Sequence, residues 1–374
     1  MKKTLAALAV LGAFAGTAAA ADVTLYGVAD VGLKYTYFDS DKTGEDSTNT
    51  LAMTSGNQSG SRFGLKGTEE LGNGLKIGFV LENGFSADDG TLGQSSRLFG
   101  REANVYLQGD FGTLSFGRVG NLQSGNGSYG LTGNLSPFGT SWPDSVEGAD
   151  YFVGMTRMDN TVTYVSPSFA GVQISAQYSF NVDSKATETG TTTALPEGKS
   201  GSNRYGALGA TYKNGGLNLA LVADWWNWST INYSDPDDGF SITAGGSYDF
   251  GVVKAFLGAQ YFDNMLPVGY TSPLEISEAA KGYGVMAGVD VPAFGGNAMF
   301  AVGYTDAESA ETTASVDNEY TRLGASVGYT YPLSKRTNVY AVGSFYQEEV
   351  TDNIQKTELK PKTGVVYLGM RHKF

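Results

Sequence analysis

Apolar and polar residues alternate along most of the chain. In Val23–Lys34 the odd-numbered positions are apolar or small, whereas the even-numbered positions include Thr24, Asp30 and Lys34. Because successive side chains of a strand point to opposite faces, this pattern predicts a β-strand with one apolar and one more polar face. The same period recurs to the end of the chain and predicts sixteen strands. They are Val23–Lys34, Arg62–Glu70, Leu75–Glu82, Glu102–Gln108, Thr113–Phe116, Thr161–Val165, Val172–Tyr178, Tyr205–Tyr212, Leu217–Trp225, Ile242–Phe250, Val253–Phe262, Tyr283–Val291, Ala298–Tyr304, Tyr320–Tyr331, Val339–Tyr346 and Thr363–Phe374.

The connections between these strands alternate in length. The short ones, several of them glycine-rich like hairpin turns, are 72–74, 110–112, 167–171, 214–216, 249–251, 292–297 and 334–336. Longer polar ones fall between them: 39–61, 87–97, 120–157, 181–203, 229–239, 263–281, 306–319 and 350–362. An even strand number with short turns at one rim and long loops at the other predicts an all-β fold, a 16-stranded antiparallel transmembrane β-barrel. A soluble sandwich would also alternate, but it has little reason to separate its loops by length.

Aromatic residues gather near the ends of several predicted strands. The groups are Tyr35, Tyr37 and Phe38, then Trp225, Trp226 and Trp228, then Tyr329 and Tyr331. Such positions are typical of the aromatic girdles that flank the apolar band of a transmembrane barrel. For the tryptophans, ordinary core packing and a platform for a sugar ring stay open as alternatives.

The first twenty residues have the features of a secretory signal peptide. Lys2 and Lys3 form a positive n-region, Leu5–Ala15 is an apolar h-region, and residues 18–20 are small. Cleavage is expected after Ala20 or Ala21, so that residues 21–374 form one barrel domain. The apolar run is too short to cross a bilayer, and no later run of 18 apolar residues follows.

Charge and cysteine content narrow the function. The chain has no cysteine, so an exported protein of this sequence has no disulfide framework. Without Lys2 and Lys3 it has 23 bases against 38 acids, a formal balance of −15. That balance, without any basic cluster, argues against nucleic acid as a partner. It favours cations that approach from outside, because low-dielectric walls focus the field.

One connection is far longer than the others. Gly120–Arg157 has 38 residues, and a structureless connection above about 15 residues is either functional, disordered or a misread element. Simple disorder fits poorly, because the segment holds five aromatics and three clustered acids. These are Tyr129, Phe138, Trp142, Tyr151 and Phe152, and Asp144, Glu147 and Asp150. We expect the segment to fold into the lumen of the barrel and to narrow it.

Five motifs in order make the chain similar to the Gram-negative general diffusion porin family. They are DVTLYGVAD at 22–30, SRFGLKGTEELG at 61–72, GDFGTLSFGR at 109–118, DNTVTYVSPSFAG at 159–171 and LGMRHKF at 368–374. The resemblance covers the whole mature chain. It implies a homotrimer of sixteen-stranded barrels whose third external loop folds inward as an eyelet. It also implies passive diffusion of small hydrophilic solutes and ions through a water-filled channel, without a cofactor.

The resemblance further implies basic residues on the barrel wall that face acids on the inward loop. By motif, the wall bases are Arg62, Arg118 and Arg157, with Lys66 as a weaker addition on the face of Arg62. The loop acids are taken to be Asp144, Glu147 and Asp150, although the family's loop motif is not matched cleanly. In the first strand, Val28 stands where some relatives place an inward lysine. Each charge could instead be a solvated residue without a role in selectivity.

Alternation supports Arg62 independently and makes Arg118 difficult. Phe63 and Leu65 occupy the opposite, lipid-compatible face from Arg62. Strict alternation from Leu114 and Phe116 would point Arg118 at lipid, which costs roughly 2–4 kcal/mol near the midplane. A bulge or kink at Gly117 would turn it toward the lumen.

The last strand ends in Phe374, with Leu368, Met370 and His372 on the same face. A terminal aromatic on an alternating strand resembles the signal read by the outer-membrane assembly machinery, and simple closure against Val23–Leu33 is an equally valid role. Outer-membrane lipid and lipopolysaccharide are the other expected partners of such a barrel.

Three other functions compete with a general channel. A barrel enzyme lacks a credible base, because His372 is the only histidine, and no Cys/His metal cluster is present. The acids at 235–238 lack the spacing of a calcium loop, although calcium between acidic loops stays open. A surface adhesin gives no reason for so long a segment among arginines. A sugar- or organic-acid-selective channel depends on where Tyr129, Trp142 and Tyr151 lie.

Overall fold

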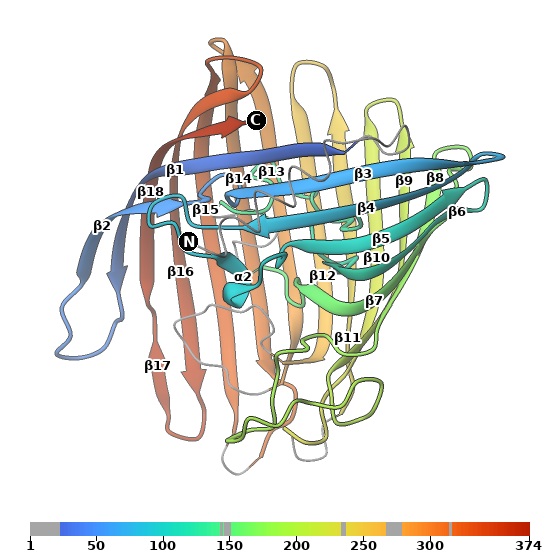
Figure 1. Cartoon of the computed structure of the whole chain (residues 1–374). Coiled ribbons are helices and arrows are strands. Elements are labelled where there is room, and N and C mark those ends of the chain that lie inside the picture. Colours follow the sequence, from blue (N-terminus) through green and yellow to red (C-terminus); the bar gives the residue numbers. More distant parts are fainter. Residues whose placement is uncertain (1–22, 143–144, 146–150, 233–236, 267–278, 314–315) are drawn as a thin grey trace, which may run out of the picture.

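The computed structural model describes residues 23–142, 145, 151–232, 237–266, 279–313 and 316–374, and these form one antiparallel sheet (Figure 1). The strands are β1 (Thr24–Asp39), β2 (Thr48–Ser55), β3 (Arg62–Gly72), β4 (Leu75–Gly84), β5 (Glu102–Gly109), β6 (Gly112–Gly120), β7 (Arg157–Val165), β8 (Val172–Ser179), β9 (Arg204–Asn214), β10 (Leu217–Asn227), β11 (Gly239–Asp249), β12 (Lys254–Met265), β13 (Ala280–Ala293), β14 (Gly296–Ser309), β15 (Asn318–Pro332), β16 (Thr337–Asp352), β17 (Thr357–Leu359) and β18 (Lys362–Lys373). The predicted signal peptide, residues 1–20, lies outside the described residues.

Sixteen of these strands close into a ring. Each strand from β3 to β16 pairs with its neighbour in sequence, β16 also pairs with β18, and β1 pairs with both β18 and β3. Every pairing is antiparallel, so the predicted sixteen-stranded barrel is confirmed. Closure gives each of these sixteen strands a partner on both sides, which is what allows a β-sheet to lie in lipid.

The strands β2 and β17 are additions to the ring. Both lie in connections, 39–61 and 350–362, for which the sequence predicted no regular structure. Strand β2 pairs with Val31–Phe38 of β1, beyond the point where β3 pairs with Thr24–Val28. The long first strand therefore has two successive partners on one side. One described helix, α2 (Gly93–Ser96), is far too short to cross a membrane.

The two faces of the sheet have opposite chemistry. Large apolar side chains are exposed on the outside, among them Leu25, Val105, Phe116, Ile174, Leu208, Leu257, Phe300, Leu323, Phe345 and Leu368. Buried polar side chains lie at the alternate positions, among them Asp30, Ser115, Thr163, Gln177, Asp224, Thr243, Gln260, Arg322 and Glu348. This is the reverse of a soluble protein and matches a barrel with an apolar band outside and a polar lumen.

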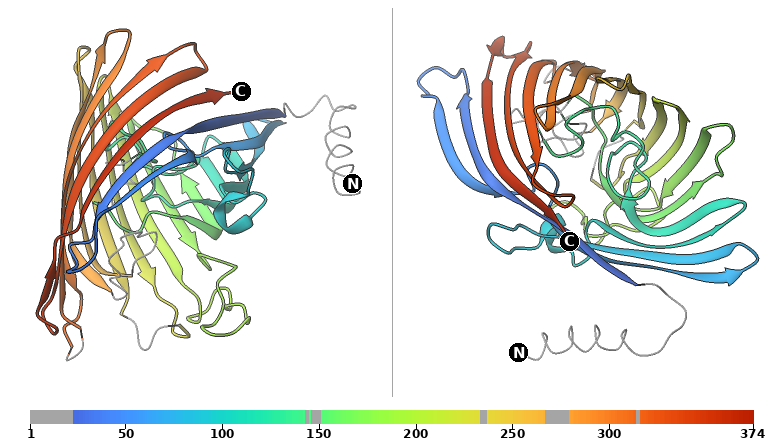
Figure 2. Two further views of the ribbon diagram at one scale, coloured as in Figure 1. Left: turned by 90° about the vertical axis from the view of Figure 1, so that its left-hand side faces the viewer. Right: turned by 90° about the horizontal axis from the view of Figure 1, so that it is seen from above.

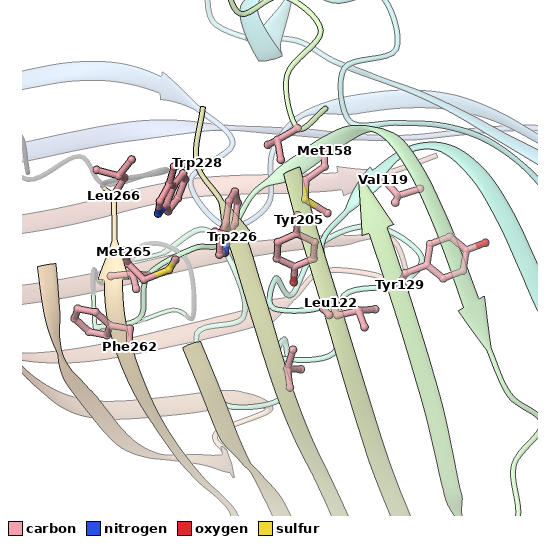
Figure 3. Packing of buried hydrophobic residues seen from close by; sticks show 14 of the residues in the cluster. Val119, Leu122, Tyr129, Met158, Tyr205, Trp226, Trp228, Phe262, Met265 and Leu266 are labelled. Atoms are coloured by element: carbon pink, nitrogen blue, oxygen red, sulfur yellow. The ribbon is translucent and has the colours of Figure 1, made fainter. Parts of the chain in front are cut away.

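The girdle prediction is wrong for two of the three tryptophans. Trp225 is 47% exposed on the outer face, but Trp226 and Trp228 are buried and stacked with ring centroids 5.1 Å apart. Figure 3 shows them in an inner cluster with Tyr205, Phe262 and other apolar residues. Adjacent residues of a strand face opposite ways, so Trp225 and Trp226 cannot share one environment. Core packing, one of the alternatives, describes the inner pair.

Candidate functional site in the barrel lumen

The segment between β6 and β7 packs against the polar face of the sheet. Its described residues are 121–142, 145 and 151–156, and they lie within the ring of strands in the view from above (Figure 2). The five aromatic residues that the sequence analysis noted in this segment are all buried: Tyr129, Phe138, Trp142, Tyr151 and Phe152. They pack in three apolar clusters with residues of the wall. Burial raises the pKa of the Tyr129 phenol to about 12, so this ring is neutral at ordinary pH.

Side-chain amides of the wall bind the backbone of this segment. Gln260 of β12 accepts a hydrogen bond from Val153 N at 2.6 Å and donates one to Val153 O at 3.1 Å. Gln177 of β8 accepts one from Leu122 N at 2.9 Å and donates one to Gly120 O at 3.2 Å. Within the segment, Gln123 also donates to the Thr243 hydroxyl of β11. Gln260 and Gln177 thus bond backbone groups that a neighbouring strand would bond in a sheet. Buried backbone N–H and C=O groups need such partners.

Glycines of the wall make room for the segment's rings. A Cβ at Gly303 of β14 or at Gly324 of β15 would overlap the side chain of Tyr151, and one at Gly284 of β13 would overlap its carbonyl oxygen. Gly303 and Gly324 face each other in the β14–β15 pairing. The three glycines therefore form a cradle into which Tyr151 fits, and we call them the Tyr151 cradle.

A charged pair lies beside this cradle. The Arg322 guanidinium is 3.9 Å from the ring centroid of Tyr346 and 5.8 Å from that of Tyr151. Its NH1 atom is 2.9 Å from Glu348 Oε1, and both side chains are buried. A buried charge of this kind needs a paired partner, and the aromatic faces add cation–π attraction.

The predicted wall bases Arg62 and Lys66 both lie on the inner face of β3, as alternation predicted. Arg62 NH2 donates to the Ser59 hydroxyl at 2.7 Å, and its Nε is 3.9 Å from Glu82 Oε2. Glu82 makes a closer ion pair with Arg101 Nε at 2.6 Å. Lys66 Nζ lies 5.3 Å from the ring centroid of Tyr26, whose hydroxyl donates to Glu82 at 3.0 Å. Glu82 thus connects two arginines and a tyrosine.

The bulge predicted at Gly117 is present. The β6–β7 pairing shifts register between Gly117 and Val119, and Gly117 has φ +137°, which a residue with a side chain rarely adopts. Arg118 is half-buried and bonded to inner-face groups: its Nε donates to Gly100 O at 2.7 Å, and its NH1 is 2.6 Å from Asp159 Oδ1. Because of the bulge, the Arg118 side chain contacts inner-face groups rather than lipid, which strict alternation would have made it face.

A second arginine shares the carboxylate of Asp159. Arg97 NH2 is 3.0 Å from Asp159 Oδ2 and also contacts Asp183, while Ser184 N donates to Asp159 at 2.9 Å. Asp159 of β7 therefore pairs with Arg118 and Arg97 at once. Sequence reasoning singled out Arg118 but missed Arg97, Arg101, Glu82, Glu102 and Asp159. Glu82 and Glu102 occupy polar-face positions of predicted strands, which is the signal that identifies them, but Arg97 and Arg101 belong to an irregular connection without period.

The other predicted site residues have mixed outcomes. Arg157 begins β7 opposite Gly120 and is half-buried. The three predicted loop acids Asp144, Glu147 and Asp150 lie outside the described residues. One wall acid does contact the segment, since Ser128 N donates to Glu102 Oε2 at 3.2 Å. No group of three or more potential metal ligands occurs among the residues that the structure describes.

Phe374 closes the barrel at the chain end. Its nitrogen donates to Gly27 O at 3.1 Å, and Gly27 N donates to its carbonyl oxygen at 3.0 Å. Its exposed ring lies on the same outer face as Leu368 and Met370. A Cβ at Gly27 would overlap this ring, so the first strand has a glycine where the last side chain crosses it. The strand-closure role is thus present in the structure.

A closed sheet that is apolar outside, polar inside and lined with ion pairs defines a transmembrane β-barrel channel protein. The chain belongs to the Gram-negative porin family, whose model matches residues 6–351. It is 35% identical over the full length of both chains to an outer membrane porin protein of Bordetella pertussis. It is 32% identical to outer membrane porin protein 32 of Delftia acidovorans, over 93% of this chain and 90% of that one. These relationships place the protein in the bacterial outer membrane.

Solved structures have the same fold. The anion-selective porin from Comamonas acidovorans matches with a TM-score of 0.63 and 26% identity, over 95% of this chain and 100% of that one. The outer membrane channel DcaP of Acinetobacter baumannii matches with a TM-score of 0.65 and 18% identity, over 96% and 99% of the two chains. At that identity the second likeness bears on the fold alone.

Proposed function

We propose that the protein forms a permanently open, water-filled channel through which small hydrophilic solutes and ions diffuse passively across the outer membrane. The observation that supports this most directly is the inner face of the closed ring, where charged pairs such as Arg118–Asp159 and Arg62–Glu82 lie at polar positions. Water and ions are stable beside such a surface, whereas the outer face suits acyl chains. Diffusion down a gradient needs neither a cofactor nor a catalytic residue.

We further propose that the segment 120–157 is the eyelet of this channel. Its buried rings and the Gln260 and Gln177 hydrogen bonds support a fixed position against the wall. Arg62, Lys66, Arg118 and Arg157 would supply the basic side of the narrow region, and Asp144, Glu147 and Asp150 the acidic side. Opposed charges create a transverse field that orients polar solutes and disfavours apolar ones, which cannot replace ordered water.

The aromatic side chains of the segment favour general diffusion over a sugar-specific channel. A sugar platform needs exposed ring faces, but Tyr129, Trp142 and Tyr151 are all buried against the wall. An organic-acid-selective channel remains the second candidate, because Arg62, Arg101 and Arg118 could attract carboxylates. Catalysis has no support, because the only histidine, His372, is exposed near the chain end and contacts the hydroxyl of Thr337.

The partners proposed for the barrel follow from its surfaces. Outer-membrane lipid and lipopolysaccharide would contact the exposed apolar band. The terminal strand with Phe374 would be read by the outer-membrane assembly machinery, after removal of residues 1–20. We propose a homotrimer as the assembled form; one solved relative of the fold, OmpT of Vibrio cholerae, is described in a trimer form.

Ion preference depends on the eyelet more than on net charge. On the described wall, bases outnumber the acids that lie near them. The bases are Arg62, Lys66, Arg97, Arg101 and Arg118, and the acids are Glu82, Glu102 and Asp159. If the three acids of the segment also face this wall, a weak preference for cations results. The solved porin from Comamonas acidovorans is described as anion-selective. If this channel also prefers anions in a salt gradient, the three acids of the segment do not determine its ion preference.

Planar-bilayer recording of the purified full chain tests the function. We expect stepwise conductance that rises in proportion to salt concentration, and no saturable block by maltose or glucose. Saturable block by dicarboxylates alone would favour the organic-acid channel. Absence of channels from correctly folded protein, or solubility of the protein without detergent, would overturn the proposal.

A further inference from the structure

A cavity of about 280 Å³ lies at the end of the barrel that carries the short turns. It is lined by Gln58, by the adjoining ends of β14, β15, β16 and β18, by Gly295 in the β13–β14 turn and by the β15–β16 turn. The four charged residues in its lining, Lys335, Arg336, Arg371 and Lys373, are all basic, and no acid contributes to it among the described residues. We propose that this cavity, which we call the basic vestibule, binds small multivalent oxyanions such as inorganic phosphate.

The basic vestibule is built from segments far apart in the sequence. Arg371 lies opposite Asn338 in the β16–β18 pairing, and its Nε donates to Asn338 Oδ1 at 3.1 Å. Asn338 Nδ2 in turn donates to Gln58 Oε1 at 2.8 Å. Lys373 N donates to Arg336 O at 2.8 Å, which ties the last strand to the β15–β16 turn. These bonds hold the last strand beside the β15–β16 turn, so that the four cations line one cavity. The bond to Asn338 holds one edge of the Arg371 guanidinium.

The acid closest to this group in the strand pairing is engaged elsewhere. Asp30 of β1 lies opposite Arg371, but it is fully buried and forms no ion pair with it among the described side chains. Its Oδ2 accepts hydrogen bonds from Gln58 N and Ser59 N, each at 2.7 Å, and its Oδ1 accepts one from Tyr340 OH at 2.6 Å. Asp30 thus positions Gln58 above the cavity. Its carboxyl group still interacts electrostatically with Arg371, but four cations of the lining stand against this one acid, so the cavity stays positive.

The composition of the vestibule fits an oxyanion. Arg371 can offer its planar fork to two oxygens at once, while the lysines add point charges that need no fixed geometry. A cavity of this volume has room for several water molecules and therefore for a partly hydrated small anion. Arg371 and Lys373 alternate with Met370 and His372, and Met370 is exposed on the outer face. The two cations therefore face the lumen, away from lipid headgroups.

This inference rests on the proposed function, because it gives the passive channel an anion site at one mouth. Such a site raises the local concentration of phosphate near the lumen and slows its passage. It also makes the channel asymmetric, because the site lies at the mouth that carries the short turns.

Bilayer recording in potassium chloride, with inorganic phosphate added to one side, tests the inference. We expect phosphate to reduce the chloride current saturably from one side of the membrane, at concentrations at least tenfold lower than from the other. The double substitution R371Q/K373Q should raise the half-saturating concentration about tenfold. Because Arg371 is bonded to Asn338, the exposed turn pair K335Q/R336Q provides a second variant that leaves the strand bonds intact, and the same direction is expected. K213Q, at the turn end of β9 and outside the cavity lining, is the matched control and should leave the block unchanged.

The outcomes separate the two proposals. Absence of wild-type channels contradicts the proposed function, whereas wild-type channels without one-sided phosphate block overturn only the vestibule. Equal loss of block in K213Q would overturn it too, because charge at the rim alone would then suffice. Block that appears only in bilayers with anionic phospholipid, and not in zwitterionic ones, would assign the four cations to lipid and overturn a site for free anions.

Discussion

Gln260 binds both backbone groups of Val153, accepting from its nitrogen at 2.6 Å and donating to its carbonyl at 3.1 Å. This pairing resembles that of two neighbouring strands, but it joins a barrel strand to a segment that is not part of the sheet. Because both groups are buried, neither can exchange its partner for water without cost. The position of the segment against the wall thus depends on a few side chains of the barrel strands.

Replacing Gln260 with leucine should loosen the segment. Two hydrogen bonds are lost and the Val153 backbone groups remain buried, at a cost of about 1–3 kcal/mol for each group left unsatisfied. We expect a larger and noisier single-channel conductance, measured in planar bilayers, with the barrel still folded. Q108L, at an exposed position of β5, is the matched control. Unchanged conductance and noise in Q260L would contradict an anchoring role for this amide.

Substitution within the Tyr151 cradle should displace the ring. In G303A the new methyl group would overlap the Tyr151 side chain, so the segment must move into the lumen. We expect a smaller conductance or a lower folded yield, and recovery toward the wild-type value in G303A/Y151A. G343A on β16 is the control, because a Cβ there meets nothing within 4 Å. Failure of Y151A to rescue would mean that Gly303 matters for another reason.

Substitutions of Arg118 and of Asp159 should change the ion preference in opposite directions. R118Q removes a lumen-facing cation, so the potassium-to-chloride permeability ratio should rise, by roughly sevenfold if the local potential energy of a unit charge falls by about one kT. D159N should lower the ratio because it leaves Arg118 without its carboxylate partner and Arg97 with Asp183 alone. Reversal potentials in a potassium chloride gradient measure both, with K42Q in an exposed loop as control. Shifts of the same sign in both variants would exclude a local electrostatic origin.

The glycine at the bulge should be needed for assembly. Gly117 has φ +137°, and a Cβ would also overlap the carbonyl oxygen of Ala103, so G117V must restore regular pairing or strain the backbone. Regular pairing would turn Arg118 toward lipid at a cost of roughly 2–4 kcal/mol. We expect the folded yield, measured from the heat-modifiable mobility on gels, to fall severalfold. In G206A the nearest atom to the new Cβ is 3.8 Å away, so this variant should fold normally. Normal folding of G117V would refute the need for the bulge.

Deletion of Phe374 should lower assembly yield without altering the conductance of channels that do form. The deletion removes both the ring and the two backbone bonds to Gly27, whereas F374A removes the ring alone. Equal losses in both variants would assign the effect to the aromatic signal, and a loss only on deletion would assign it to strand closure. F294A, in an exposed turn at the same end, is the control. A changed conductance in either terminal variant would contradict a role confined to assembly.

The sequence by itself determined the barrel, because a closed sheet between lipid and water repeats one simple rule. Each strand must alternate, and each wrong residue on the outer face costs free energy, so strand number, inner residues such as Arg62 and even the Gly117 bulge are readable locally. Alternation also places Trp225 and Trp226 on opposite faces of the strand. The girdle prediction assigned both to the outer face and was therefore wrong for Trp226. Membership of the porin family followed from ordered motifs.

The tertiary structure alone decided what lies inside the ring. Gln260 meets Val153 across 107 positions of sequence, and Gly303 and Gly324 meet Tyr151 only because two neighbouring strands bring them beside one loop. No period marks such positions, since an inner glutamine or glycine suits water as well as it suits a packed segment. The partners of Arg118 and the grouping of Arg371 with Arg336 likewise depend on which strand ends adjoin. Local alternation selects a face, but only closure of the sheet selects the neighbours on that face.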